Sequence, residues 1–325
     1  MSKVSKAVGV TGLFTAGMLA LTGCGANAGS AAQGQGYTPK GDVTMTVPFG
    51  AGGGSDLSGR AIAAGLEDIT GVNINTENRE GGSGAVGYAS FLAQEGKPEH
   101  LLATETAMLA LPLTQDVPFT YESFTPIMKL GDDYTILTVK PDSPYNTCDE
   151  VVKAAGSGRV VAAVSGSTSL DEIVFTLIEQ EEGVKFDRVP YESGNEVVAG
   201  LLGGQVDVIS VNPGEVLGQL EAGTLKPLCA VADKRYEFDA LKDIPTATEQ
   251  GIDVSFAQFR GFIAPGNITA EQKQYWIDAA KKFAETDGYK KYIEENLLQA
   301  NAVYGDDFKT YLAGNSEDLA KVLGK

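Results

Sequence analysis

Three short segments rich in glycine, serine and threonine are places in the sequence where a small anion could bind. They are residues 50–56 (GAGGGSD), 81–84 (GGSG) and 165–169 (SGSTS), and each joins a strand-like run to a helical pattern. A helix N-terminus presents free backbone N–H groups and a partial positive charge, and glycine lets a ligand approach that backbone. These turns therefore predict an anion site, although each one alone could be an ordinary tight turn with a helix N-cap.

The first of these turns does not match a nucleotide-binding loop. No Gly-Lys-Ser/Thr follows it, and Gly50, Gly52 and Ser55 break the G-x-G-x-x-G pattern at its third glycine. Catalysis has little support, because His100 is the only histidine and lies in a polar turn. Residues 81–85 would resemble a nucleophile elbow only with alanine in place of the last glycine. We therefore expect no enzyme, no catalytic residue and no cofactor.

Composition narrows the kind of protein further. The chain has 325 residues, a formal net charge of −18 and 43% hydrophobic residues, which suits a globular protein of about two domains. So acidic a chain is a poor partner for nucleic acid. One histidine and three cysteines also leave few ligands for a metal ion, so we expect no metal site.

The first 24 residues predict export and a lipid anchor. Two lysines precede an apolar run over residues 7–21, which is too short to span a bilayer, and the Leu-Thr-Gly-Cys sequence that ends at Cys24 is typical of a bacterial lipobox. We predict a lipoprotein signal peptide over residues 1–23, lipidation of Cys24 and a flexible tether over 24–40. Ordinary signal cleavage beside an unmodified Cys24, or an uncleaved anchor, are the alternatives.

The two other cysteines leave a question open. Outside the cytoplasm, Cys148 and Cys229 could form a disulfide bond. Cys148 opens a helical pattern and Cys229 lies in an apolar, strand-like run, so both could equally be small buried apolar residues.

From residue 42 onward, β-rich runs alternate with helical patterns, which is typical of α/β folds with largely parallel sheets. The predicted strands are 42–49, 72–77, 101–106, 135–140, 159–165, 186–191, 205–211 and 256–265. The predicted helices are 57–67, 85–95, 147–155, 170–181 and 195–202, with two or three more between 269 and 323. Thr269 and Gln272 predict a capping box at the start of that last region. Turns after parallel strands lie at one edge of a sheet, so the three turns can converge on one cleft.

Several motifs resemble the substrate-binding receptors of tripartite tricarboxylate transporters, also called Bug-type receptors. The resemblance runs from about Val43 to the end of the chain. It is carried by Pro48-Phe49, Gly52-Gly53-x-x-Asp56, Arg60, Phe124-Thr125-Pro126, Val189-Pro190-Tyr191, residues 201–207 (LLGGQVD), residues 222–226 (AGTLK) and Pro245-Thr246-x-x-Glu249. Two turns depart from the family pattern: Glu80 replaces a proline, and Leu170 is not preceded by the family's histidine.

The resemblance implies a two-lobe periplasmic-binding-protein-like fold of type II. Two α/β domains would be joined by a two-strand hinge, with the ligand cleft between them. Lobe one would comprise residues 41–133 plus 258–325, and lobe two residues 134–257. The resemblance also implies that a small carboxylate is held by backbone N–H groups, hydroxyls and bridging waters, and is then delivered to a membrane permease.

Taken together, the turns and the resemblance predict a ligand-binding set drawn from both lobes. Its members are Phe49, Gly50, Ala51, Gly52, Gly53, Ser55, Asp56, Gly82, Ser83, Gly84, Thr106, Ser165, Ser167, Thr168, Ser169 and Tyr191. We predict a monomeric, extracytoplasmic, membrane-anchored bacterial lipoprotein that contacts a small carboxylate ligand, permease subunits and, through the lipid on Cys24, the membrane. A receptor for another small solute, such as an amino acid or a sugar, and an exported hydrolase are the alternatives.

Overall fold

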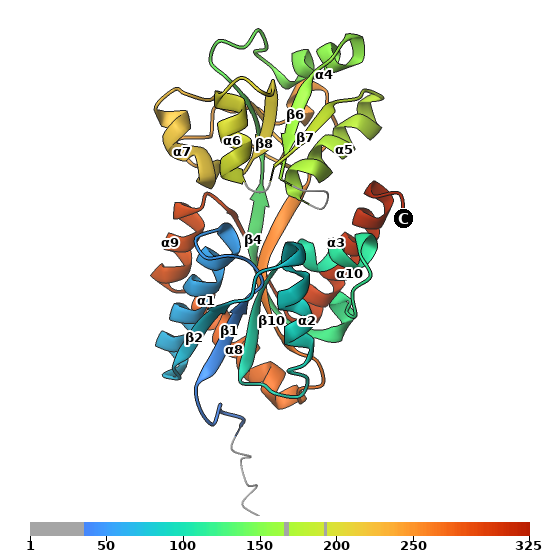
Figure 1. The fold of residues 1–325 in the computed structure, drawn as a ribbon. Coiled ribbons are helices and arrows are strands. Elements are labelled where there is room, and N and C mark those ends of the chain that lie inside the picture. Colours follow the sequence, from blue (N-terminus) through green and yellow to red (C-terminus); the bar gives the residue numbers. More distant parts are fainter. Residues whose placement is uncertain (1–35, 166–168, 192–193) are drawn as a thin grey trace, which may run out of the picture. The chain divides into compact units, whose positions relative to one another are not determined.

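Two β-sheets, each with helices on its faces, organise the protein in the computed structural model (Figure 1). The structure describes residues 36–165, 169–191 and 194–325. The predicted signal peptide, Cys24 and most of the tether lie outside the described residues, and so do Ser167 and Thr168. Within these ranges, no helix combines the length and the apolar character needed to cross a membrane.

The larger sheet belongs to the part of the molecule that we call lobe one. Within the described ranges its strand order is β11-β4-β10-β3-β1-β2. The strands are β1 (Val43–Val47), β2 (Ile74–Asn78), β3 (His100–Glu105), β4 (Phe124–Tyr134), β10 (Ala257–Pro265) and β11 (Gln299–Tyr304). Strand β1 pairs in parallel with β2 and β3, whereas β10 is antiparallel to both β3 and β4, and β11 is antiparallel to β4.

Helices cover both faces of this sheet. They are α1 (Gly54–Thr70), α2 (Ala85–Leu92), α3 (Ala107–Thr114), α8 (Ala270–Ala284), α9 (Asp287–Glu295) and α10 (Gly305–Val322). Side chains alternate between the faces of a strand. Leu101 therefore packs in a cluster with α1, α8 and α9, while the adjacent Leu102 packs with α2, α3 and α10 on the other face.

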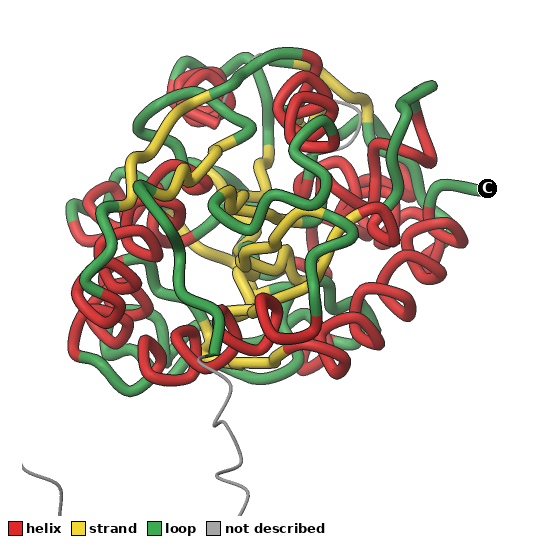
Figure 2. The backbone as a smooth tube through the Cα atoms, turned by 90° about the horizontal axis from the view of Figure 1, so that it is seen from below, coloured by secondary structure: helices red, strands yellow, loops and turns green. Residues whose placement is uncertain are grey.

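The smaller sheet belongs to lobe two and has the order β7-β6-β8-β5-β9. Its strands are β5 (Ile136–Val139), β6 (Val161–Val164), β7 (Asp187–Pro190), β8 (Val208–Val211) and β9 (Lys226–Ala230), and its helices are α4 (Cys148–Ser157), α5 (Leu170–Glu182), α6 (Gly194–Leu202) and α7 (Pro213–Glu221). Strand β6 is parallel to β7 and β8, whereas β5 is antiparallel to β8 and β9. In Figure 2, which shows the molecule from below, many of the strands lie toward the centre and most helices lie toward the outside.

The chain passes between the two sheets at two places. Thr135 separates β4 from β5, and residues 231–256 connect β9 to β10. The backbone N–H of Val231 donates to the carbonyl oxygen of Thr135 at 2.9 Å. The passage that enters lobe two and the passage that leaves it are therefore hydrogen-bonded to each other. A hinge at these passages, and the lobe boundaries given above, stay predictions.

The predicted pattern of elements is largely confirmed, but β4, α3 and α7 were not among the predicted elements, and two further features differ. Both sheets are mixed rather than mainly parallel, because β10, β11 and β5 run against their neighbours. The C-terminal region contains the strand β11 between α9 and α10, where only helices were expected. The capping box is present: the Thr269 side chain accepts from the backbone of Gln272, and the Gln272 side chain accepts from the backbone of Thr269.

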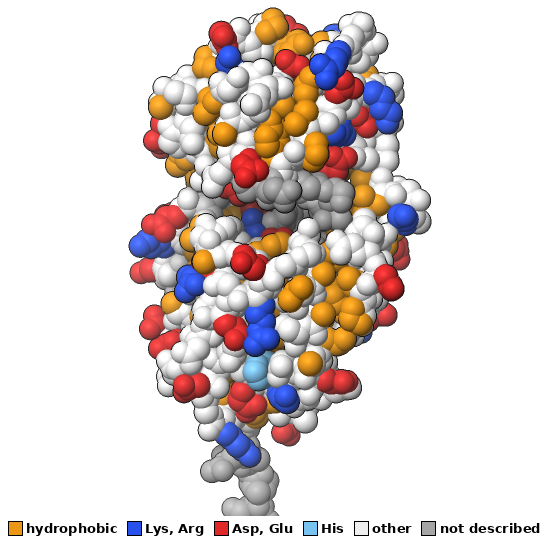
Figure 3. All heavy atoms as spheres, in the orientation of Figure 1, with side chains coloured by type: hydrophobic (Ala, Val, Ile, Leu, Met, Phe, Trp, Pro, Cys, Tyr) orange, Lys and Arg blue, Asp and Glu red, His pale blue; other side chains and the backbone are white. Residues whose placement is uncertain are grey.

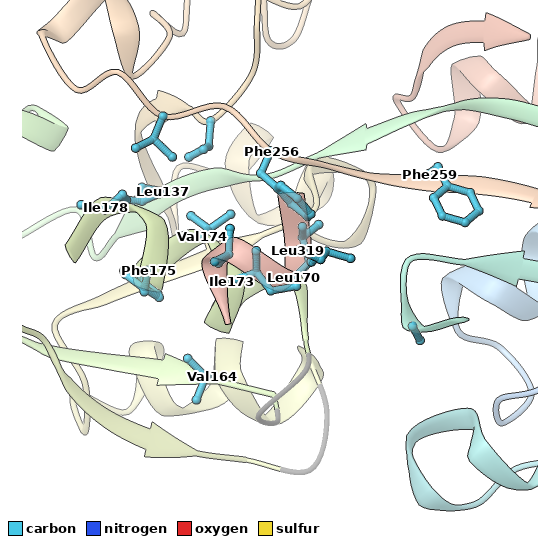
Figure 4. Packing of buried hydrophobic residues seen from close by; sticks show 14 of the residues in the cluster. Leu137, Val164, Leu170, Ile173, Val174, Phe175, Ile178, Phe256, Phe259 and Leu319 are labelled. Carbon is cyan, nitrogen blue, oxygen red and sulfur yellow. The ribbon is translucent and has the colours of Figure 1, made fainter. Parts of the chain in front are cut away.

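The end of the C-terminal helix packs against lobe two. Leu319 of α10 lies in one buried cluster with Leu170 and Ile173 of α5 and with Phe256 (Figure 4). The amide of Gln180 in α5 also donates to the carbonyl oxygen of Val322 at 2.8 Å. Apolar burial and a hydrogen bond therefore connect the last turns of the chain to the middle of the sequence.

A disulfide bond between Cys148 and Cys229 answers the question that the sequence left open. It joins the start of α4 to strand β9, with the two Cα atoms 5.9 Å apart and a separation of 81 positions in sequence. Both cysteines are fully buried. The bond closes a long loop, which restricts the unfolded chain and favours the folded state.

We expect replacement of both Cys148 and Cys229 by alanine to lower the free energy of unfolding by about 2–5 kcal/mol, the usual cost of losing a disulfide bond. The measurement is denaturant unfolding of the oxidised protein and of the variant. Reductant should destabilise the wild type alone. Equal unfolding midpoints for the two proteins would contradict a stabilising bond.

Candidate ligand-binding site

A cavity of about 400 Å³ lies between the two lobes, and the face of the molecule in Figure 3 is hollowed there. Lobe one contributes the start of α1 and the end of α9, and lobe two contributes the starts of α6 and α7. The lining residues are Gly52, Gly53, Gly54, Leu57, Asp133, Gly194, Asn195, Asn212, Gly214, Glu215, Arg260, Tyr292, Asn296 and Leu298.

Arg260 of β10 forms the base of the cavity with two carboxylates. Its Nη1 lies 2.6 Å from Oε2 of Glu105, and its Nη2 and Nε lie 2.7 and 3.1 Å from Oδ2 of Asp133. All three side chains are buried, at 5–8% exposure. Burial raises the pKa of the Asp133 carboxyl, and the charge of Arg260 opposes that effect. A buried cation of this kind is tolerated because charged partners surround it.

The start of α1 lies directly against this arginine. A Cβ atom on Gly54 would be only 2.6 Å from Nη2 of Arg260, so the close approach requires glycine at this position. The hydroxyl of Ser55 donates to Oε2 of Glu105 at 2.6 Å and accepts from Nη1 of Arg260 at 3.3 Å. The first turn of α1 is thereby fixed at the edge of the cavity.

Asp56 folds the turn that precedes α1. One carboxylate oxygen accepts from the backbone N–H of Gly52 and from Arg60, each at 2.9 Å, and the other accepts from Asn78 at 2.9 Å. Although burial opposes ionisation, these hydrogen bonds lower the pKa of Asp56. The side chain therefore has a structural role that the sequence motif did not reveal.

A side-chain amide on lobe two, that of Asn212, is hydrogen-bonded to Asp133 at the base of the cavity. Asn212, the N-cap residue of α7, donates from Nδ2 to Oδ1 of Asp133 at 2.6 Å instead of capping its own helix. Gly214 meets lobe one directly, because a Cβ there would lie 2.8 Å from the carbonyl oxygen of Asn296. The neighbouring Leu297 has a φ of 54° and packs within the apolar cluster of lobe two.

Of the predicted ligand-binding residues, Gly52 and Gly53 line this cavity. The described residues of the set that are absent from the lining are Phe49, Gly50, Ala51, Ser55, Asp56, Gly82, Ser83, Gly84, Thr106, Ser165, Ser169 and Tyr191. Several of these side chains bond to the protein itself. The Thr106 hydroxyl accepts from the backbone N–H of Phe259, Ser165 and Ser169 donate to Asp171, and the Tyr191 hydroxyl donates to Gln205.

The second glycine turn has a conformational explanation. All four residues of this turn, 81–84, have positive φ values, between 56° and 133°. This backbone conformation favours glycine. A Cβ on Gly84 would also lie 3.0 Å from the ring of Phe49. This turn therefore needs no ligand to account for its composition.

Arg260, Asp133 and the turn at residues 212–215 line the cavity but were not among the residues predicted from the sequence. Arg260 is a single charge in the apolar run FAQFRGFIAP, and a lone arginine at a core position was a usable signal. The segment 212–215 follows β8 and opens α7, which is the same kind of position as the three turns that were selected. Its single glycine does not mark it as a glycine-rich turn.

The two-lobed α/β fold with a cavity between the lobes defines a solute-binding protein. The chain belongs to the family described as "Tripartite tricarboxylate transporter family receptor", whose model matches residues 59–323. Its sequence is 29% identical over 220 residues to Protein BugT of Bordetella pertussis, covering 66% of this chain and 67% of BugT. The family resemblance is confirmed, and the proteins of this family are receptors rather than enzymes.

Solved structures show the same fold. A TctC solute-binding protein from Polaromonas is 26% identical, with a TM-score of 0.76 over 89% of this chain and 99% of that chain. Rpa4515 of R. palustris, described with adipate, is 23% identical, with a TM-score of 0.75 over 88% of this chain and 98% of that one. The predicted two-lobe binding-protein fold is therefore confirmed.

We expect Arg260→Met to destabilise the protein by about 3–5 kcal/mol, because it leaves the carboxylates of Glu105 and Asp133 buried without their cation. Denaturant unfolding measures the change. Lys153→Gln, which removes an exposed ion pair with Asp149, is the control and should change stability little. Similar small effects for both variants would show that the buried network is dispensable.

Proposed function

We propose that this protein is an extracytoplasmic receptor that captures a small carboxylate and delivers it to the permease of a tripartite tricarboxylate-type transporter. The observation that carries the proposal is the cavity, which opens onto an uncapped helix N-terminus. Membership of the receptor family supports both the role and the location outside the cytoplasm. The adipate named with Rpa4515 is a small dicarboxylate, which supports this class of ligand.

The start of α1 supplies donors for a carboxylate. The N-cap residue is Gly53, which has no side chain that could cap the helix. The backbone N–H groups of Gly53, Gly54 and Ser55 donate no hydrogen bond to any group in the part of the chain that the structure describes. A helix of 17 residues places partial positive charge at this end. A cavity of about 400 Å³ is in the size range of small-molecule sites. Backbone capture at this turn agrees with the acidic composition, because contact hydrogen bonds act at short range while distant charges are screened.

The proposal also includes ligand contacts from lobe two, a hinge between the lobes and a lipid anchor. The predicted set that includes Ser167, Thr168 and Tyr191 would close over the ligand as lobe two, residues 134–257, moves at the two passages. Lobe one would be residues 41–133 plus 258–325. The lipid on Cys24 and the tether over 24–40 would hold a monomeric receptor near its permease.

We expect mono-, di- or tricarboxylates to raise the melting temperature, and Gly53→Val to weaken binding of the best acid at least about tenfold. A Cβ at Gly53 lies 3.8 Å from its nearest neighbour, so the fold accepts valine while the branched side chain blocks the N–H groups. Gly158→Val is a matched control, because its Cβ clearance is also 3.8 Å and it directly follows α4, outside the cavity lining.

Calorimetric titration measures the affinities, with the apo melting curves as a check on folding. Equal affinity in Gly53→Val and wild type would refute capture at α1. Stabilisation by sugars alone would favour a sugar receptor, and chemical conversion of the recovered acid would favour a hydrolase.

We expect Cys24→Ala to release the protein from the membrane fraction, because Cys24 is the lipid acceptor in the lipobox. Fractionation of cells and the mass of the N-terminal peptide measure the outcome. A variant that stays in the membrane fraction with an unchanged N-terminal mass would contradict lipidation at this residue.

A further inference from the structure

Glu215 is an acidic side chain on the lobe-two wall of the cavity without a cationic partner. It lies in the first turn of α7, and no ion pair or hydrogen bond to its carboxylate is formed by the described residues. A glutamate three residues after an N-cap residue can accept from the backbone N–H of that residue, as it does in a capping box. Here the Asn212 amide bonds to Asp133 and no side-chain cap is formed at α7, so the Glu215 carboxylate is left to line the cavity.

The surroundings of Glu215 carry an excess of negative charge. Arg260 is shared between Glu105 and Asp133, so its single positive charge is already balanced before Glu215 is counted. Asp171 is a further carboxylate that acts on Glu215. Burial by the surrounding protein raises the pKa of Glu215, and the charge of Asp133 raises it further, whereas Arg260 opposes them. A cation beside the Glu215 carboxylate would therefore be attracted by the excess of negative charge at this wall.

The two walls of the cavity thus favour opposite charges. The start of α1 on lobe one offers backbone donors to an anion, and Glu215 on lobe two offers an acceptor to a cation. Gly194 allows this acceptor to reach the cavity, because a Cβ there would lie 2.9 Å from Oε2 of Glu215. A plain tricarboxylate would place negative charge against Glu215, which is unfavourable in a desolvated site.

We propose that Glu215 is a specificity-determining residue that pairs with a cationic nitrogen, so that the preferred solute is a small carboxylate that also carries an ammonium group. This inference rests on the proposed carboxylate-binding function. It adds that one wall selects the acid group and the other selects the amine.

The test uses pairs of acids that differ only in one amino group, such as succinate with aspartate and glutarate with glutamate. We expect the wild type to bind the amino acid of a pair at least about tenfold more tightly than the plain acid, as expected for one charged contact in a closed site. Glu215→Gln should remove that preference and raise the affinity for the plain acid, because the negative charge that opposes it is gone. Glu221→Gln at the end of the same helix is the control and should keep the preference.

Calorimetric titration gives the affinities, and melting curves of the unliganded variants confirm folding. Glu215→Asp, which keeps the charge, should keep part of the preference. Tight binding of plain acids by the wild type, without gain from an amino group, would overturn this inference and leave the carboxylate function intact. A preference that survives Glu215→Gln would also overturn it. Absence of binding for every acid, with or without an amino group, would overturn both proposals.

Discussion

The buried guanidinium of Arg260 joins three strands of lobe one at the point where the chain leaves for lobe two. It bonds to Glu105 at the end of β3 and to Asp133 near the end of β4, partners 155 and 127 residues away in sequence. Each charge is acceptable in the interior only because the others are present. Asn212 then attaches lobe two to the same Asp133, so the base of the cavity and the position of its far wall depend on one network.

The periodic parts of the structure were readable from the sequence, and the network was not. Alternating apolar runs located most strands, and the Thr269 capping box marked the start of α8. Strand β4 was obscured because Lys129, Asp132 and Asp133 occupy positions that are buried in the sheet, which breaks the expected apolar pattern. No local sequence pattern predicts the ion pair between Asp133 of β4 and Arg260 of β10, because the two residues come together only when the sheet forms.

Glycine content was an incomplete guide to the site. The turn at 50–56 reaches the cavity through Gly52, Gly53 and Gly54, whereas the turn at 81–84 is explained by its positive φ values. Glycine lets a ligand approach the backbone closely, and it also adopts left-handed backbone conformations. The composition of a turn does not show which of these two reasons applies. The segment 212–215 on the lobe-two wall contains a single glycine, so its composition does not mark it as a glycine-rich turn.

The place of β10 in the larger sheet has a consequence for the order in which the protein can fold. Strand β10 lies between β3 and β4, although it is made more than a hundred residues after either of them. The strands of lobe two, in contrast, all fall between residues 136 and 230, so that sheet can form from one continuous stretch. During synthesis or passage across a membrane, lobe two is therefore available first. The base of the cavity, which needs Arg260, is completed only when nearly the whole chain has emerged.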